Sequence, residues 1–566
     1  MAAAASYLPT LGSAPKPFVC AAHHPRSSQT MSSATAACRR GGGRIIGCME
    51  TARDCGSASH HCAWANIRLE RWEGDLAVQG HIPAWLNGTY LRNGPGVWEV
   101  GGGEHAFEHV FDGYATLVRV SIRGARGRAV GAHRQIESDA YTSAMACGRP
   151  IMREFSQICP RDPGSLLDRL RSAVGLAAGA AMSDNANTVV LPLGDGRRVL
   201  CLADVNKSSV LVDPETLDTI GKLRYMDRLW WWRCPVQCTH PVVTRSGSGD
   251  ELLTLLPDFA RRGYLVVRMP TTTGSNEREV LGRVRCRGGP TPGWVHSFAV
   301  TERYIVVPEM PLRYSVGRML KSEIGPLYIL DWLPDSGSFM HVICRSTGNT
   351  VASVAVPPFV AFHFINAYEE RGDDGGGSMA NAVIADCCEY YADPAIIQAL
   401  ALHRLRSLDT AKELFPESRV ARFRIPLDGS PLGMLETALD PDAHGRGVEL
   451  STINPAYTGR EYRYLYACSI RRPYNFFNSL TKMDLVEKDA KSWHEEGTVP
   501  SEPFFVARPG GELEDDGVVI STVTSMDGGG YVLLLDAATF QEIARLKFPY
   551  GLPVGFHGCW IPDKSH

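Results

Sequence analysis

Two segments that lie far apart in the chain share one strand–turn–strand pattern. The first, VLVDPETLDTIGKL, runs from Val210 to Leu223, and the second, LLLDAATFQEIARL, runs from Leu533 to Leu546. The identical residues pair Asp213 with Asp536, Thr216 with Thr539, Ile220 with Ile543 and Leu223 with Leu546. Similar hairpins occur in FRIPLDGSPLGMLETAL and HVICRSTGNTVASVAV. Recurring hairpins over roughly 500 residues predict an all-β propeller of four-stranded blades, with a large sandwich as the alternative.

The composition agrees with many short strands and argues against several classes of protein. The 566 residues include 56 Gly and 36 Pro, which favour turns. The formal net charge of -3 gives no sign of a nucleic-acid partner, and no apolar run approaches the ~18 residues that span a bilayer. The 16 Cys are scattered, so buried reduced thiols are expected. A zinc site at Cys234, Cys238 and His240 would lack a second pair of ligands nearby.

The N-terminal segment differs from the rest of the chain. From Met1 to Met49 there is no Asp or Glu, whereas Ala, Ser, Gly and Arg are frequent, and no continuous apolar stretch of a secretory signal is present. An acid-poor, Ser-rich leader that contains Arg is typical of an organelle transit peptide. We therefore expect a transit peptide or disordered leader over residues 1–55 and one propeller domain over residues 56–566.

Helical pattern is sparse. One candidate is Ser165–Met182, which combines a basic and an apolar face, and the other is Pro394–Leu405. The first could lie at a membrane interface, although such helices more often pack on their own domain. The run Trp230–Trp232 is compatible with a lipid surface, with the core or with a tunnel wall.

Four histidines stand beside short β-prone runs. They are His240 in CTHPVVT, His296 in GWVHSFAVTERYIVVPE, His363 in FVAFHFINAYEE and His557 in PVGFHGCW. Their separations of 56, 67 and 194 residues correspond to about one, one and several blades. A propeller could therefore supply one histidine per blade, all directed at its axis. Neutral imidazole is a good ligand for Fe, Cu, Zn and Ni, although a single histidine is more often a core or surface residue.

Signatures of other functions are missing from the sequence. It contains no G-x-S-x-G elbow of a serine hydrolase and no nucleotide-binding P-loop. A non-enzymatic propeller scaffold of the WD40 type would show repeated Gly-His and Trp-Asp signatures, which are not present either.

The sequences around the four histidines resemble those of the carotenoid cleavage dioxygenases. The resemblance runs from about Trp64 to Pro562 and includes GHIPAWLNGTYLRNGPG, HVFDGYATLVRV, FHFINAYEE and the C-terminal GFHG. It implies a seven-bladed β-propeller with Fe(II) on its axis and a dome of helices and loops above the iron. It also implies that the iron ligands are His240, His296, His363 and His557.

Carboxylates of the family bond to three of the ligand histidines. Glu449, in GVELSTINP, and Glu502, in SEPFFVARPG, match two of these positions. The third position falls in RVLCLADVNKSS, where this chain has Asp204 instead of the family's Glu. The resemblance thus implies that Asp204, Glu449 and Glu502 support the ligands.

The resemblance further implies an enzyme that cleaves a conjugated polyene with O2 into two carbonyl products. RQIES, DPDAHGRG and INPAYTGREYRYLYAC are similar to the plant class-eight branch, which converts 9-cis-β-apo-10'-carotenal to carlactone in strigolactone biosynthesis. The expected partners are an apocarotenoid and O2, in the plastid stroma or with peripheral contact to a plastid membrane, without nucleic acid or an obligate protein partner.

One departure from the class pattern leaves alternatives open. The segment LWWWRCPVQCTHP replaces the small residues that usually precede the first ligand histidine. A dioxygenase of different regiospecificity and a low-activity paralogue are therefore alternatives. The retinoid isomerohydrolase branch, which uses four histidines to split an ester without O2, is another.

Asp204→Glu is expected to maintain or raise the iron content of the protein. Asp is one methylene shorter than the Glu of the family, so that its bond to a histidine would lengthen or need a water. Iron per protein, measured by mass spectrometry after identical loading of the wild type and the variant, checks this. A clear loss of iron in the variant would count against a role of Asp204 beside a ligand.

Overall fold

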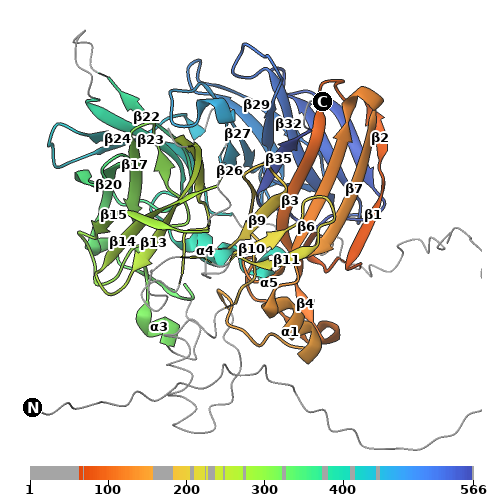
Figure 1. Cartoon of the computed structure of the whole chain (residues 1–566), viewed down its shortest axis with the longest axis horizontal. Helices are drawn as coiled ribbons and strands as arrows, with labels where there is room; N and C mark the ends of the chain where they lie inside the picture. Colours follow the sequence, from red (N-terminus) through yellow and green to blue (C-terminus); the bar gives the residue numbers. More distant parts are fainter. Residues whose placement is uncertain are drawn as a thin grey trace, which may run out of the picture. The chain divides into compact units, whose positions relative to one another are not determined.

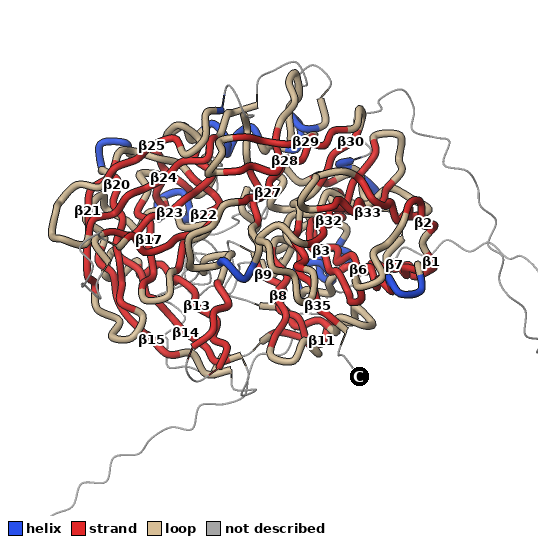
Figure 2. Tube along the Cα trace, turned by 90° about the horizontal axis from the view of Figure 1, so that it is seen from above, coloured by secondary structure: helices blue, strands red, loops and turns tan. Residues whose placement is uncertain are grey.

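The computed structural model describes residues 63–563 except 68, 157–182, 204–208, 224, 227–235, 247–248, 272–275, 321–326, 372–379, 408–414 and 442–445. Residues Asp54–His566 form one compact unit. Its described residues form seven sheets of four or more strands, arranged around a common centre (Figures 1 and 2). The predicted seven-bladed all-β propeller is therefore confirmed.

Each blade is one sheet, and its strands are named in the order in which they are hydrogen-bonded to one another. Blade 1 contains β1 (Arg71–Asp75), β7 (Arg128–Gln135), β6 (Tyr114–Arg123), β3 (Asn87–Val97) and β35 (Gly558–Pro562). Blade 2 contains β11 (Thr219–Lys222), β10 (Val210–Val212), β9 (Arg198–Leu202) and β8 (Val189–Leu193). Blade 3 contains β12 (Val242–Ser246), β13 (Gly249–Asp258), β14 (Gly263–Pro270) and β15 (Glu279–Arg285). Blade 4 contains β16 (Ala299–Val300), β17 (Tyr304–Glu309), β20 (Ser338–Cys344) and β21 (Thr350–Val356).

The remaining blades follow the same order. Blade 5 contains β22 (Ala361–Glu370), β23 (Ala382–Glu389), β24 (Arg419–Pro426) and β25 (Met434–Thr437). Blade 6 contains β26 (Glu449–Thr452), β27 (Tyr464–Ser469), β28 (Ser479–Asp484) and β29 (Asp489–His494). Blade 7 contains β2 (Ala77–Gly80), β34 (Glu542–Phe548), β33 (Gly530–Asp536), β32 (Gly517–Ser525) and β30 (Thr498–Pro500), with β31 (Phe504–Ala507) also paired to β32.

Short elements lie outside the blades. Two-strand ribbons pair β4 (Glu99–Val100) with β5 (His105–Ala106) and β18 (Leu312–Tyr314) with β19 (Leu330–Trp332). The short helices are α1 (Asp139–Cys147), α3 (Val316–Leu320), α4 (Ala395–Ala399) and α5 (Leu402–Leu405), all toward the lower part of Figure 1. The 3-10 turns are Gly101–Gly103, Gly124–Arg126, Pro334–Ser336 and Pro455–Tyr457. No helix among the described residues is long and apolar enough to cross a bilayer.

The hairpins expected from the sequence are all found, each as two neighbouring strands of a blade. They form β10–β11, β20–β21, β24–β25 and β33–β34. The shared Asp explains the likeness of two of them. Asp213 accepts hydrogen bonds from the backbone N–H of Thr216, and Asp536 does the same for Thr539. Four residues after each Asp the backbone enters the left-handed region, with φ of 61° at Leu217 and 60° at Phe540.

The ring of blades is closed twice by chain ends. β35, from the C-terminus, pairs with β3 and completes blade 1. β2, from the N-terminal part, pairs with β34 and extends blade 7. Both pairings join strands from opposite ends of the chain within one sheet, and the propeller leaves only short outer edges free.

The apolar core is divided among the spaces between blades. One cluster of buried side chains joins blade 1 to blade 7, another joins blades 3 and 4, and a third joins blades 5 and 6. Because each blade is covered on both faces, its middle strands are buried almost throughout, as in β23 and β32.

One of the expected helices is broken. Pro394–Leu405 forms α4 and α5 instead of one helix. Ala401 between them has extended backbone angles and pairs with His109, which interrupts the helical hydrogen bonds. The other helix candidate, Ser165–Met182, and the run Trp230–Trp232 lie outside the described residues.

Gly94→Ala is expected to lower stability by about 1–3 kcal/mol, because it forces backbone apart. A Cβ at Gly94 in β3 would lie 2.6 Å from the carbonyl oxygen of Val554 and 2.8 Å from Cα of Gly555. Thermal unfolding measures the loss. Gly317→Ala in α3 is the matched control, because a Cβ there meets no atom within 4 Å. An unchanged Tm for Gly94→Ala would contradict the close packing of this segment.

Candidate metal centre

The starts of the innermost strands meet at one end of the propeller axis. Neighbouring inner strands contact one another around this axis, as β8 contacts β35 and β22 contacts β26. Each blade places one polar side chain at or just before its inner strand or strands. In blade order these are His557, Thr188, His240, His296, His363, Glu449 and Glu502.

The four histidines point their Nε2 atoms at one another. Nε2 of His296 lies 3.1 Å from that of His240 and 3.3 Å from that of His363, which in turn lies 3.2 Å from Nε2 of His557. All four ligand atoms fall within 4.8 Å of one another. Metal–imidazole bonds of about 2.1 Å would place neighbouring nitrogens roughly 3.0–3.4 Å apart, for right-angled to tetrahedral geometry.

Two carboxylates fix the protons of two imidazoles. Oε2 of Glu449 is bonded to Nδ1 of His363, and Oε1 of Glu502 lies 2.7 Å from Nδ1 of His557. Because an ionised carboxylate only accepts, each Nδ1 carries the hydrogen and each Nε2 presents a lone pair to the centre. Asp204, expected beside a third ligand, lies outside the described residues.

The arrangement fits a cation. Burial, together with the other three histidines, holds the pKa of His240 well below its usual range. Burial lowers the pKa of His557 to about 4, even though Glu502 acts to raise it. Neutral imidazoles whose lone pairs converge within 3.3 Å repel one another unless a positive ion lies between them. The donor set therefore fits a metal ion, and the assignment of each histidine as a ligand stays a prediction.

Glu502 belongs to a larger buried network. Its Oε2 accepts from Nη1 of Arg92 at 3.0 Å and from the backbone N–H of Gly558 at 3.0 Å. Burial raises the pKa of Glu502, but His557 and Arg92 more than offset this, so that the pKa lies below its ordinary value. Arg92 also donates to the Phe556 carbonyl, and thereby holds the backbone next to His557.

Hydrogen bonds to the backbone hold the segments around the other histidines in place. The hydroxyl of Ser297 donates to the carbonyl of Phe362, and the N–H of Phe364 donates back to that hydroxyl at 2.7 Å. These residues flank His296 and His363, so one serine links two blades beside their histidines. The N–H of His557 similarly donates to the Thr188 carbonyl.

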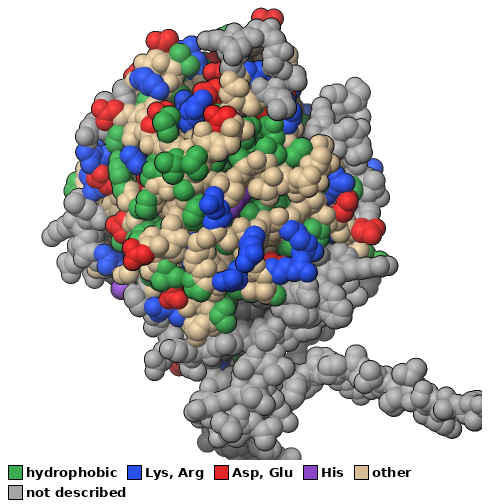
Figure 3. Space-filling view, turned by 90° about the vertical axis from the view of Figure 1, so that its left-hand side faces the viewer, with side chains coloured by type: hydrophobic (Ala, Val, Ile, Leu, Met, Phe, Trp, Pro, Cys, Tyr) green, Lys and Arg blue, Asp and Glu red, His purple; other side chains and the backbone are tan. Residues whose placement is uncertain are grey.

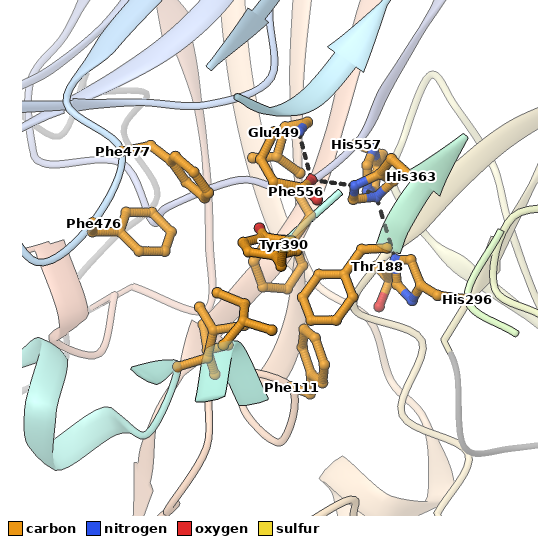
Figure 4. A pocket seen from close by; sticks show the side chains of 15 residues that line it. Phe111, Thr188, His296, His363, Tyr390, Glu449, Phe476, Phe477, Phe556 and His557 are labelled. Atoms are coloured by element: carbon orange, nitrogen blue, oxygen red, sulfur yellow. Dashed lines mark hydrogen bonds and ion pairs between the residues drawn. The ribbon is translucent and has the colours of Figure 1, made fainter. Parts of the chain in front are cut away.

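A narrow, largely apolar cavity of about 40 Å³ adjoins the histidines. Figure 4 shows Phe476 and Phe477 at one end, the histidines at the other, and Tyr390 with Glu449 between them. The wall is completed by Val110, Phe111, Thr188, Phe362, Ile396, Leu400, Leu450 and Phe556. Several of these residues lie in connections between strands, including α4 and the loop before β28.

The outer surface of the propeller is of mixed charge. In the space-filling view of Figure 3, Lys and Arg side chains are interspersed with Asp and Glu over the visible face, in line with the small formal net charge of -3. Apolar side chains are also spread over this face (Figure 3).

Several residues of the site were not found from the sequence. Thr188 and Tyr390 are neither charged nor metal ligands, and nothing in their local pattern marks them. Arg92 had a usable signal, because it is a charged residue inside the apolar β-prone segment GTYLRNGPG. Its side chain is only 1% exposed, which requires a buried partner.

A comparison with protein-family models shows to which family the chain belongs. The model described as RPE65, retinal pigment epithelial membrane protein, matches residues 64–562. The chain belongs to the carotenoid oxygenase family of enzymes. Among curated relatives of this carotenoid oxygenase, carotenoid cleavage dioxygenase 8 homolog A, chloroplastic, of Oryza sativa subsp. japonica is 65% identical over 501 residues, which are 88% of this chain and 87% of the relative.

A second relative and a solved structure extend the comparison. Carotenoid cleavage dioxygenase 8, chloroplastic, of Arabidopsis thaliana is 54% identical to this carotenoid oxygenase, over 89% of the chain and 86% of the relative. A mutant of Synechocystis apocarotenoid oxygenase superposes with a TM-score of 0.72 at 21% identity, covering 89% of this chain and 98% of the other. That likeness shows the same propeller fold.

Arg92→Met is expected to destabilise the metal-free protein by about 3–5 kcal/mol, because Glu502 would stay buried without its cation. Urea unfolding at neutral pH measures the change. Arg128→Met removes an ion pair with Asp75 whose side chains are 65% and 68% exposed, and should cost at most about 1 kcal/mol. Equal losses of stability in the two variants would show that the buried ion pair contributes no more than the exposed one.

Proposed function

We propose that the protein is a non-haem Fe(II) dioxygenase that cleaves and rearranges an apocarotenoid, 9-cis-β-apo-10'-carotenal, to carlactone. The observation behind this proposal is the convergence of four imidazole Nε2 atoms beside an apolar, aromatic cavity. The high identity to carotenoid cleavage dioxygenase 8 relatives supports the substrate class.

In this proposal His240, His296, His363 and His557 hold the iron, and Glu449 and Glu502 orient two of them. Bound Fe(II) would supply the electron-transfer chemistry that O2 needs in order to react with an alkene. The four imidazoles are neutral, so the carboxylates just behind them supply the negative charge that balances the ion. Asp204 is proposed to do the same for a third histidine.

The cavity would select the double bond that is cleaved. A polyene offers few polar groups, so shape and aromatic contact must position it. Phe111 stacks parallel to His296, with ring centroids 6.3 Å apart and planes 13° apart, and so forms a flat surface next to the centre. Phe476 and Phe477 limit the far end (Figure 4). The apolar lining also keeps water away from the reacting carbons.

The proposed location is the plastid. It is supported by the acid-poor leader of residues 1–55 and by the relatives, which are named chloroplastic. The substrate is lipophilic, so peripheral contact with a plastid membrane is part of the proposal. No nucleic acid or obligate protein partner is invoked.

The direct test is a product assay. The chain from about residue 55 is loaded with Fe(II), incubated in air with 9-cis-β-apo-10'-carotenal, and analysed by chromatography and mass spectrometry. Carlactone is the expected product. Bound iron without any product would point to a different apocarotenoid, and absence of both would indicate a degenerate paralogue. Cleavage of a retinoid ester without O2, with no turnover of the aldehyde in air, would favour the isomerohydrolase alternative.

His363→Ala is expected to abolish turnover and to lower iron content, because one lone pair of the four is removed. Circular dichroism should still report a folded β-protein. His494→Ala is the matched control, since His494 lies on the outer strand β29, away from the centre. Normal turnover in His363→Ala would refute the ligand assignment.

A further inference from the structure

The carboxylates of Glu502 and Glu449, which are bonded to two of the histidines, differ in how many of their oxygens have hydrogen-bond partners. Both oxygens of Glu502 have partners, and Arg92 is one of them. In Glu449, Oε2 accepts from Nδ1 of His363 and from the backbone N–H of Leu450. The other oxygen, Oε1, is buried and has no hydrogen-bond partner of good geometry among the described residues. A buried carboxylate oxygen without a donor is costly, so a donor should be close by.

Tyr390 is the neighbouring group of complementary character. It follows β23 directly and is 1% exposed, and its ring packs on Phe362 with centroids 5.5 Å apart. Its hydroxyl is also buried without a partner of good geometry in the described part of the chain. Burial, and then the charge of Glu449, raise the pKa of the phenol well above its usual range, which indicates that the two groups are close. Both line the same side of the cavity (Figure 4).

We propose that Tyr390 is a positioning residue that donates its hydroxyl hydrogen to Oε1 of Glu449 and thereby fixes the carboxylate that orients His363. Glu449 has no arginine of the kind that holds Glu502 among the residues that the structure describes. With only Oε2 bonded, its carboxylate could turn about its terminal torsion and change the direction of the His363 ring. A bond from Tyr390 to Oε1 would lock both oxygens. The backbone N–H of Tyr390 is itself bonded to the Val360 carbonyl at 2.8 Å, so the donor rests on the chain that leads into β22.

This inference rests on metal binding by the histidines, as proposed above, but not on the identity of the substrate. Tyr390→Phe removes one hydroxyl and keeps the ring that lines the cavity. Partners behind metal ligands typically contribute 10–100-fold to affinity, so a group one bond further out should contribute less. We therefore expect Tyr390→Phe to bind metal about 3–10-fold more weakly, with faster release and an unchanged fold.

The test titrates Co(II) into metal-free protein and follows its visible absorption, and then measures release of Co(II) into a chelator. Tyr466→Phe is the matched control, because it removes another fully buried hydroxyl, which contacts the Ala537 carbonyl at 3.4 Å, away from Glu449. The control should bind Co(II) like the wild type. Thermal unfolding of the metal-free proteins checks that neither substitution disturbs the fold.

A double-mutant cycle separates positioning from a general packing effect. In a Glu449→Ala background, confirmed as folded by circular dichroism, Tyr390→Phe should have no further effect on Co(II) affinity. An equal loss in both backgrounds would overturn the proposal, as would wild-type affinity and release in the single variant. Failure of the wild type to bind Co(II) would overturn the metal centre itself, and is thus distinct from failure of Tyr390 alone.

Discussion

The pairing of β35 with β3 is the interaction on which the rest of the site depends. It sets Gly558 opposite Arg92, so His557, one residue earlier, enters the axis beside the strand that carries its supporting arginine. The N–H of Asn93 donates to the carbonyl of His557 at 2.9 Å, which continues this contact. The pairing that closes the ring therefore also completes the histidine cluster. An open ring would lack both the fourth imidazole and the Arg92–Glu502 pair.

The charged groups around the four histidines explain how this cluster can be buried. Negative charge comes from Glu449 and Glu502, which are bonded to His363 and His557. Arg92 offsets part of this charge on the Glu502 side, and a divalent cation at the centre would offset more. Metal binding and folding are linked in such a site, because the four histidines converge only in the folded chain.

The sequence predicted the features that depend on residues close together in the chain. The hairpins were found because an Asp-led turn recurs between short apolar strands, and the histidines because the segments around them resemble those of the carotenoid cleavage dioxygenases. Features that arise between blades were not predictable. Arg92 and Glu502 are separated by 410 residues, and Tyr390 and Glu449 line one cavity although they belong to different blades. The break between α4 and α5 was missed for the same reason, since its cause is the distant His109.

The site thus combines two parts with different origins. The polar ring comes from the starts of inner strands, which are fixed by the sheets and change little without loss of the fold. The cavity comes largely from connections, such as α4 and the loop that holds Phe476 and Phe477, and connections tolerate substitution more readily. A family can therefore keep one metal centre and vary its substrates.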